Sequence, residues 1–289
     1  MKENFHQFYV GDFKCIAVND CYGLTIKDSP KHAFANASNE ELAEAARKHG
    51  FDPDQWEREA FMHCLLIDTG SRKILFDVGM GTPTLYPGSG KLRSSLLEAG
   101  ITAEEVDTII FTHGHWDHVA GLSDDTGNFL FPNAQYMMQK EEWAFWTKHE
   151  NINQLNPNHA QFDTISFERI PLINDRILLY DPEEEIFPGI RAINVPGHTL
   201  GHTAFSIISQ NQKLLHISDL VHSHLHFEYP QWHHEVDIRP EFSEASRRKV
   251  FSHAAEENLL VFGCHTNSSS GLGYIKPNED AWRWHPYSL

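Results

Sequence analysis

The chain has few long apolar runs, and none reaches the roughly 18 consecutive apolar residues that a membrane-spanning helix needs. Its first ten residues include Glu3, Asn4, His6 and Gln7, so they differ from the apolar region of a secretory signal peptide. Cysteine is also scarce, and four residues among 289 are too few for a disulfide framework. The sequence therefore predicts a reduced, cytoplasmic protein.

Positive charge is scarce as well, with 23 Lys and Arg against 40 Asp and Glu and a formal net charge of −17. Non-specific binding to nucleic acids depends on Lys and Arg, so this balance argues against a nucleic-acid partner. It also argues against an anionic membrane surface. The content of hydrophobic residues, 40%, and of aromatic residues, 12%, is sufficient for a core and excludes a disordered acidic chain. The length permits a single large α/β domain over residues 1–289.

Strands outnumber helices in the secondary structure that the sequence predicts. We expect strands at 13–18 (ended by Asn19-Asp20), 61–68, 73–77, 106–112, 135–138, 177–180, 190–195, 204–208, 213–217 and 259–263. We expect helices from a capping box at 38–41 to Gly50, and at 91–99, 140–148 and 244–256. Connections of varied length favour two packed sheets with helices outside over a regular alternation of strand and helix.

Histidine is abundant, with 20 residues. His113, His115, Asp117 and His118 follow the expected strand 106–112 directly. Imidazole nitrogens and carboxylate oxygens suit Zn²⁺ and similar ions. Four ligands so close together serve two adjacent metals more easily than one tetrahedral ion. The alternative is a polar surface loop that is rich in histidine.

This segment resembles the HxHxDH signature of the metallo-β-lactamase superfamily. Further segments are similar to other motifs of that superfamily and follow in the expected order: 75–79, 196–199, 217–220 (with Ser218 where Gly is usual) and 263–265. The resemblance covers residues 61–273. It implies an α/β fold, the four-layer αβ/βα sandwich with two mixed sheets flanked by helices, and a dinuclear metal site at one edge.

The resemblance also implies seven metal ligands, in two groups of three and one residue that bridges both metals. One metal would be held by His113, His115 and His198, the other by Asp117, His118 and His265, with Asp219 as the bridge. The expected cofactors are two divalent ions, zinc first, with manganese, cobalt or iron as alternatives. Asp77 would form a hydrogen bond with a ligand histidine and fix its tautomer.

The implied activity is hydrolysis of an ester, lactone or phosphotriester-like small molecule by a hydroxide that both metals share. Asp117 would orient this hydroxide or take its proton. The alternative is a non-hydrolytic metal protein of the same fold, such as a mononuclear iron dioxygenase.

Within the superfamily, the sequence is most similar to the branch of N-acyl homoserine lactonases and methyl parathion hydrolase. Segments 196–203, 219–222 and 270–273 resemble motifs of that branch, with Leu200 in place of a proline. Many homoserine lactonases carry a tyrosine three positions after the bridging aspartate, where this chain has His222. We expect His222 to donate a hydrogen bond to the substrate, or else to be an ordinary residue of the pocket wall. The departure favours esters or phosphotriesters, and the resemblance permits a homodimer.

Residues 27–60 interrupt the strands with a mostly polar excursion. We predict that they form a lid over an apolar pocket, together with Trp116 or Trp146, and that the substrate has an apolar part. A peripheral helix packed elsewhere is the alternative. The lid side chains would be His32, Phe34, Phe51 and Trp56.

A second group of histidines extends from His222 to His234. On an extended backbone His222, His224 and His226 would share one face. We favour a solvated loop face near the entrance; a proton-transfer wall or an accessory metal site are the alternatives. His202 is expected to support a ligand or to be a buried core histidine, and Cys264 to be a buried thiol.

Overall fold

Two mixed sheets form the centre of the protein. The structure, a computed structural model, describes residues 4–27, 29–50, 52, 57–82, 88–266 and 268–287. Within these residues each sheet has seven strands. In the first sheet the neighbours β1 to β4 are antiparallel, and β4 to β7 are parallel. Its strands, in spatial order, are β1 (Phe5–Val10), β2 (Phe13–Lys27), β3 (Glu57–Asp68), β4 (Lys73–Phe76), β5 (Thr108–Ile110), β6 (Gln135–Gln139) and β7 (Ile177–Tyr180).

The second sheet is antiparallel except for the parallel pair of β11 and β12. Its strands, in spatial order, are β14 (Ala281–Pro286), β13 (Leu272–Asn278), β12 (Leu260–Gly263), β11 (Gln212–Ser218), β10 (Thr203–Ser209), β9 (Ile190–Asn194) and β8 (Glu185–Phe187).

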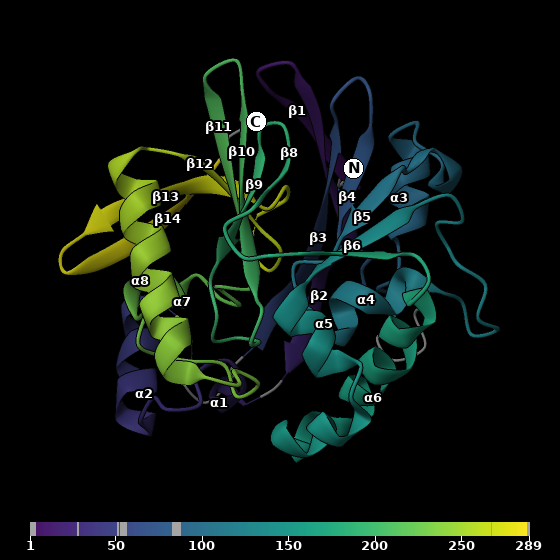
Figure 1. Ribbon diagram of the computed structural model, residues 1–289. Helices are drawn as coiled ribbons and strands as arrows, with labels where there is room; N and C mark the ends of the chain where they lie inside the picture. Colours follow the sequence, from purple (N-terminus) through teal and green to yellow (C-terminus); the bar gives the residue numbers. More distant parts are fainter. Residues whose placement is uncertain are drawn as a thin grey trace.

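Helices cover the outer faces of both sheets (Figure 1). The helices α3 and α5 pack on the first sheet, and α7 and α8 pack on the second. This arrangement confirms the predicted αβ/βα sandwich. The helices are α1 (Pro30–Ala33), α2 (Asn39–Lys48), α3 (Leu92–Glu98), α4 (Trp116–Val119), α5 (Lys140–Trp146), α6 (Ala160–Arg169), α7 (Leu225–Glu228) and α8 (Pro240–Glu256). None of these described helices is long and apolar enough to cross a membrane.

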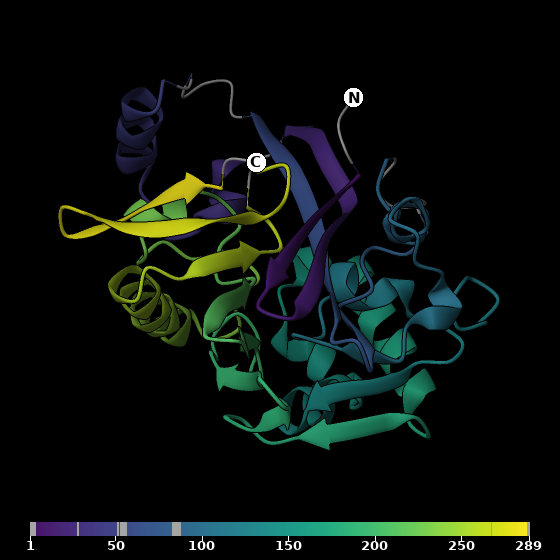
Figure 2. The same ribbon diagram turned by 90° about the horizontal axis from the view of Figure 1, so that it is seen from above.

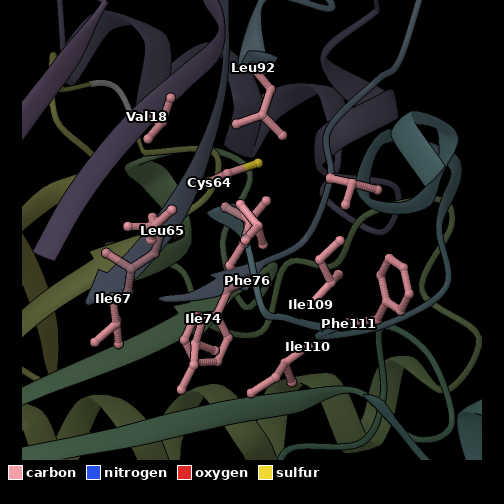
Figure 3. Close-up of a cluster of buried hydrophobic side chains, with 14 of the residues drawn as sticks. Val18, Cys64, Leu65, Ile67, Ile74, Phe76, Leu92, Ile109, Ile110 and Phe111 are labelled. Atoms are coloured by element: carbon pink, nitrogen blue, oxygen red, sulfur yellow. The ribbon is translucent and has the colours of Figure 1, made fainter. Parts of the chain in front are cut away.

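The main hydrophobic core lies between the sheets. Phe76 of β4 contacts Phe205 of β10, with ring centroids 4.8 Å apart, and the two rings come from different sheets. Figure 3 shows Phe76 with Leu65 and Ile110 in this cluster of buried side chains. The β1–β2 turn also contacts the β10–β11 turn, and both turns lie at the same end of the molecule (Figures 1 and 2). A Cβ on Gly11 would lie 2.2 Å from the carbonyl oxygen of Ser209, so this contact requires glycine.

Most of the expected elements are present with bounds shifted by a few residues, and all four cysteines are buried free thiols. The prediction that Asn19-Asp20 ends a strand is wrong, because β2 continues to Lys27 through irregularities in its pairing with β3. At this point the Asp20 carboxylate accepts hydrogen bonds from the backbone N–H groups of Met80 and Leu92, both at 3.0 Å. The polar pair therefore marks a bulge in β2, at which the side chain of Asp20 binds the backbone of neighbouring loops.

The prediction of an extended backbone for residues 221–227 is also wrong. This segment turns into the short helix α7, and His226 is fully buried where its Nε2 lies 3.1 Å from the carbonyl oxygen of Ala33. His224 packs against His49, with ring centroids 5.4 Å apart. The interpretation as a solvated loop face is therefore wrong as well.

Candidate metal centre

The predicted ligands lie beyond strand ends of both sheets, in loops and, for Asp117 and His118, in the short helix α4. The segment 113–118 follows β5 of the first sheet, and Asp219 follows β11 of the second. His198 comes after β9 and His265 after β12. The structure brings all seven predicted ligands together in two adjoining groups, listed as His113, His115 and His198, and as Asp117, His118, Asp219 and His265.

The first group consists of three buried imidazoles. The Nδ1 atom of His115 lies 3.1 Å from Nε2 of His113 and 2.8 Å from Nε2 of His198. These three nitrogens face one another, and each ring nitrogen holds at most one proton. The arrangement therefore concentrates lone pairs at one point, as a metal site requires.

The second group is centred on the buried carboxylate of Asp219. Its Oδ2 atom lies 3.2 Å from Nε2 of His118 and 3.1 Å from Nε2 of His265. The same oxygen lies 3.8 Å from Nε2 of His113 and 3.5 Å from Nε2 of His198, which belong to the first group. Asp219 is thus the residue at which the two groups meet.

Hydrogen bonds at the outer ring nitrogens orient these histidines. Nδ1 of His118 lies 2.8 Å from Oδ2 of Asp77, as predicted, and Nδ1 of His265 lies 2.6 Å from the carbonyl oxygen of Phe61. Both acceptors require a proton on Nδ1, so each neutral ring directs the lone pair of Nε2 toward Asp219. A lone pair that faces a carboxylate needs a cation between them. The donor set therefore fits divalent metal ions such as zinc.

An unpartnered polar atom supports the same conclusion. Among the described side chains, Oδ1 of Asp219 is buried without a hydrogen-bond partner, and Nε2 of His265 faces the carboxylates of Asp219 and Asp117. Protons compete with metals for such positions: burial lowers the pKa of His265, but Asp219 and Asp117 outweigh it and raise the pKa to about 10. Metal binding must displace these protons, so acid weakens it.

A buried ion pair supports His198, and the sequence analysis missed it. Nδ1 of His198 lies 2.8 Å from Oδ1 of Asp237, whose Oδ2 accepts a hydrogen bond of 3.1 Å from Arg247. Arg247 is fully buried and also donates to the carbonyl oxygens of Leu220 and Trp232. Burial raises the pKa of Asp237, but Arg247 and His198 outweigh it and hold the pKa well below its usual range. Asp237 is therefore an anion that fixes the tautomer of His198.

Glu142 of α5 is a second support that the sequence analysis missed. Its Oε1 accepts hydrogen bonds from the backbone N–H of Gly114 at 2.8 Å and from Nε1 of Trp146 at 2.6 Å. Its Oε2 accepts from Oγ1 of Thr199 and the backbone N–H of Gly201, both at 2.8 Å. One buried carboxylate thus joins the loop of His113 and His115 to the loop of His198.

A pocket adjoins the candidate centre, and residues of the centre form part of its lining. Asp117 and His222 line it, together with Trp116, whose ring stacks on Phe162 with centroids 4.9 Å apart. Of the expected lid residues, His32 lines the pocket, whereas Phe34 packs against Trp232 in a separate cluster. Phe51 and Trp56 lie outside the described residues. Trp146 is fully buried in the main core, with its ring 5.7 Å from that of His115.

The comparison with known proteins agrees with this geometry. The family model described as "Metallo-beta-lactamase superfamily" matches residues 60–234. The chain belongs to the metallo-β-lactamase superfamily. Two curated relatives are N-acyl homoserine lactonases, each 24% identical: one of Bacillus cereus over 170 residues and one of a Bacillus species over 162. The matches cover 53% and 50% of this chain, and 60% and 57% of the relatives, less than two thirds of their length.

Solved structures of this superfamily match over nearly the whole chain. The quorum-quenching lactonase AidC, described as dizinc and in complex with the product N-hexanoyl-L-homoserine, has a TM-score of 0.90 and 26% identity. The hydrolase AbOPH has a TM-score of 0.87 and 26% identity. Each match covers 100% of this chain and 99% of the other. The protein thus has the metallo-β-lactamase fold and groups with metal-dependent hydrolases.

Other residues that the sequence analysis singled out in this metallo-β-lactamase superfamily protein lie close to the candidate metal centre. Nε2 of His222 lies 3.2 Å from Oδ2 of Asp219, and His222, His198 and Asp219 form a further group with metal-binding geometry. His202 is buried; its Nδ1 lies 3.2 Å from the carbonyl oxygen of Val195, and its Nε2 accepts from the backbone N–H of Asp219. Both roles considered for His202 are therefore present. Cys264 is the buried thiol that we predicted, and burial raises its pKa well above the usual value.

Proposed function

We propose that this protein is a hydrolase that holds two divalent metal ions and opens the ester bond of a small molecule with an apolar part, a lactone foremost. The observation that carries the proposal is the meeting of both ligand groups at one oxygen of Asp219. The presence of His222 in place of a tyrosine favoured esters and phosphotriesters. The similarity to lactonases, AidC among them, supports lactones instead.

Two ions held by the seven residues would supply Lewis acidity and lower the pKa of water. The chain itself would position the reactants. The carboxylate of Asp117 lines the pocket, with Oδ2 at 3.3 Å from Nε2 of His265, so it would orient the attacking water and accept its proton. His222 lines the same pocket, with Nε2 at 3.2 Å from Oδ2 of Asp219, so it would donate a hydrogen bond to the substrate carbonyl.

The walls of the pocket support an apolar substituent on the substrate. Phe61, Met80, Trp116 and Val236 line it beside the polar residues of the centre. Among the described residues of the predicted segment 27–60, His32 of α1 and Glu59 and Ala60 of β3 line the pocket. Since β3 is a strand of the first sheet, we propose a lid limited to α1. The small-molecule partner, the cytoplasmic location, the homodimer and the single domain over residues 1–289 stay predictions.

Replacement of Asp219 by Asn tests the dinuclear centre. We expect the variant to lose at least one of two bound ions and hydrolysis to fall at least about 100-fold, because the ligand shared by both groups is gone. The measurement is metal content per chain by mass spectrometry together with kcat/KM. Asp175→Asn, at an exposed site, is the control. Full activity with two ions in the Asp219 variant would refute the proposal, and a single iron with O₂ consumption would support the dioxygenase alternative.

A substrate panel tests the preference for lactones. We expect kcat/KM to be highest for N-acyl homoserine lactones and to rise with the length of the acyl chain, since the pocket walls are partly apolar. Aryl esters and phosphotriesters complete the panel. A higher kcat/KM for a phosphotriester would favour the assignment that the sequence alone suggested.

A further inference from the structure

A second group of metal-binding side chains lies at the rim of the pocket. It consists of His32 from α1, His159 from the turn Pro157–His159, and Glu235. Nε2 of His159 lies 2.7 Å from Oε1 of Glu235, and Nδ1 of His32 contacts the same oxygen. The side chains are 29%, 14% and 23% exposed for His32, His159 and Glu235, so the group is half-buried and open to solvent.

Backbone hydrogen bonds hold these three residues in place. The N–H of Glu235 donates to the carbonyl oxygen of His32 at 3.0 Å, so the two segments are joined beside the group. Asn156 caps the turn that carries His159 and donates to the carbonyl oxygen of Glu235 at 3.3 Å. These hydrogen bonds fix the segments that carry the three side chains before a metal ion binds. The conformational cost of metal binding is therefore lower.

We propose that His32, His159 and Glu235 form a third site for a divalent cation of the zinc class. Two imidazoles and one carboxylate are a donor set that holds zinc with open positions for water. The site shares no residue with the candidate centre. The ring of His234 lies between them, 5.0 Å from the ring of His32 and 4.4 Å from that of His222.

An ion at this place would affect access to the pocket. It would join α1 of the excursion to the turn before α6 and to the segment that holds Glu235, and His32 and His159 both line the pocket. Zinc in excess over the amount that fills the candidate centre would then inhibit hydrolysis. Loss of the third site would remove this inhibition.

Metal counting tests the third site directly. The holoprotein is dialysed against Zn²⁺ over a range of concentrations, and bound zinc per chain is measured. We expect Glu235→Gln and His159→Gln to bind one ion fewer than the wild type, or to need at least about tenfold more zinc for the last ion. The difference of one ion does not depend on how many ions the centre holds, so this test is separate from that of the proposed function.

Two features of the design make the result decisive. His159→Gln keeps an N–H donor near the position of Nε2, which faces Glu235, but removes the imidazole that would bind zinc. It therefore separates metal binding from a hydrogen-bonded triad. Glu228→Gln is the control, because Glu228 pairs with Lys48 and His49 at another site. Equal zinc counts in the wild type and both variants would overturn the proposal and leave a hydrogen-bonded triad only. Excess zinc that inhibits Glu235→Gln as strongly as the wild type would overturn the predicted effect on access.

Discussion

At the scale of single residues, carboxylates outside the ligand set decide where the ligands point. Asp77, Asp237 and Glu142 each accept hydrogen bonds from a predicted ligand or from its loop. All three are buried and have lost their hydration, so each carboxylate depends on its hydrogen-bond donors to offset that loss. Removing a charge here leaves donors without an acceptor, which costs more than the hydrogen bond itself contributes.

Replacement of Glu142 by Gln illustrates this dependence. We expect the free energy of unfolding to fall by about 2–4 kcal/mol, since an amide group cannot accept all four hydrogen bonds. Metal affinity should fall with it, because both ligand loops lose their common partner. The measurements are denaturant unfolding and zinc affinity. Glu141→Gln, at the exposed neighbouring position of α5, is the control. Equal zinc affinity in both variants would show that Glu142 has no role in positioning.

Sequence reasoning named the seven residues that the structure brings together, but it missed two of their supports for a physical reason. His113, His115 and Asp117 lie in a short motif whose spacing itself brings them together, and Asp77 was predicted from the same resemblance. Glu142 lies where an acidic residue is common, in the first turn of a helix. Asp237 lies in a loop without any such pattern. Their roles arise from contacts between distant segments, which the sequence does not display.

At the scale of elements, the errors came from short polar segments. Asn19-Asp20 has the composition of a strand end, but β2 continues beyond it after a register shift against β3. The Asp20 carboxylate accepts hydrogen bonds there from the backbone N–H groups of Met80 and Leu92. Alternation of histidines over 221–227 has the period of a strand, yet the segment is too short for the period to determine its conformation. Strands with strong apolar patterns, such as β6 and β7, were predicted closely.

The helix α2 provides a test of which part of the excursion matters for the pocket. Ser38 and Glu41 form the predicted capping box, and Leu42 and Ala45 pack in a cluster with Trp232. We expect Ser38→Ala to lower the free energy of unfolding by about 1 kcal/mol and to leave KM unchanged. Ser38→Asp should retain the cap and the stability. A clear change of KM in Ser38→Ala would extend the lid from α1 to α2.

At the scale of the whole molecule, the candidate centre lies where the two sheets meet. The first sheet contributes the loop after β5, and the second contributes the loops after β9, β11 and β12. Metal ions held there would connect the two halves, and they would bind the folded chain far better than the unfolded one. Binding of this kind raises stability.

Removal of metal by a chelator should therefore lower the midpoint of thermal unfolding. Saturation at about 100 times Kd contributes about 2.7 kcal/mol, which corresponds to roughly 4–5 °C for a chain of this size. Calorimetry of the wild type with and without chelator measures the shift. The Asp219→Asn variant is the matched control and should shift much less. Identical midpoints for the wild type in both conditions would argue against a centre that spans both sheets.

The segment from Pro230 to Asp237 has an evolutionary consequence. It contributes Val236 to the pocket wall, Asp237 to the support of His198, and Glu235 to the rim group. Arg247 of α8 anchors it by donating to the backbone carbonyl oxygens of Pro230 and Trp232 and to the carboxylate of Asp237. A mutation that reshapes this wall for a new substrate would therefore also disturb His198, a predicted metal ligand. Descendants of this protein would acquire new specificities more readily through α1, because His32 lines the pocket without belonging to the ligand groups of the candidate centre.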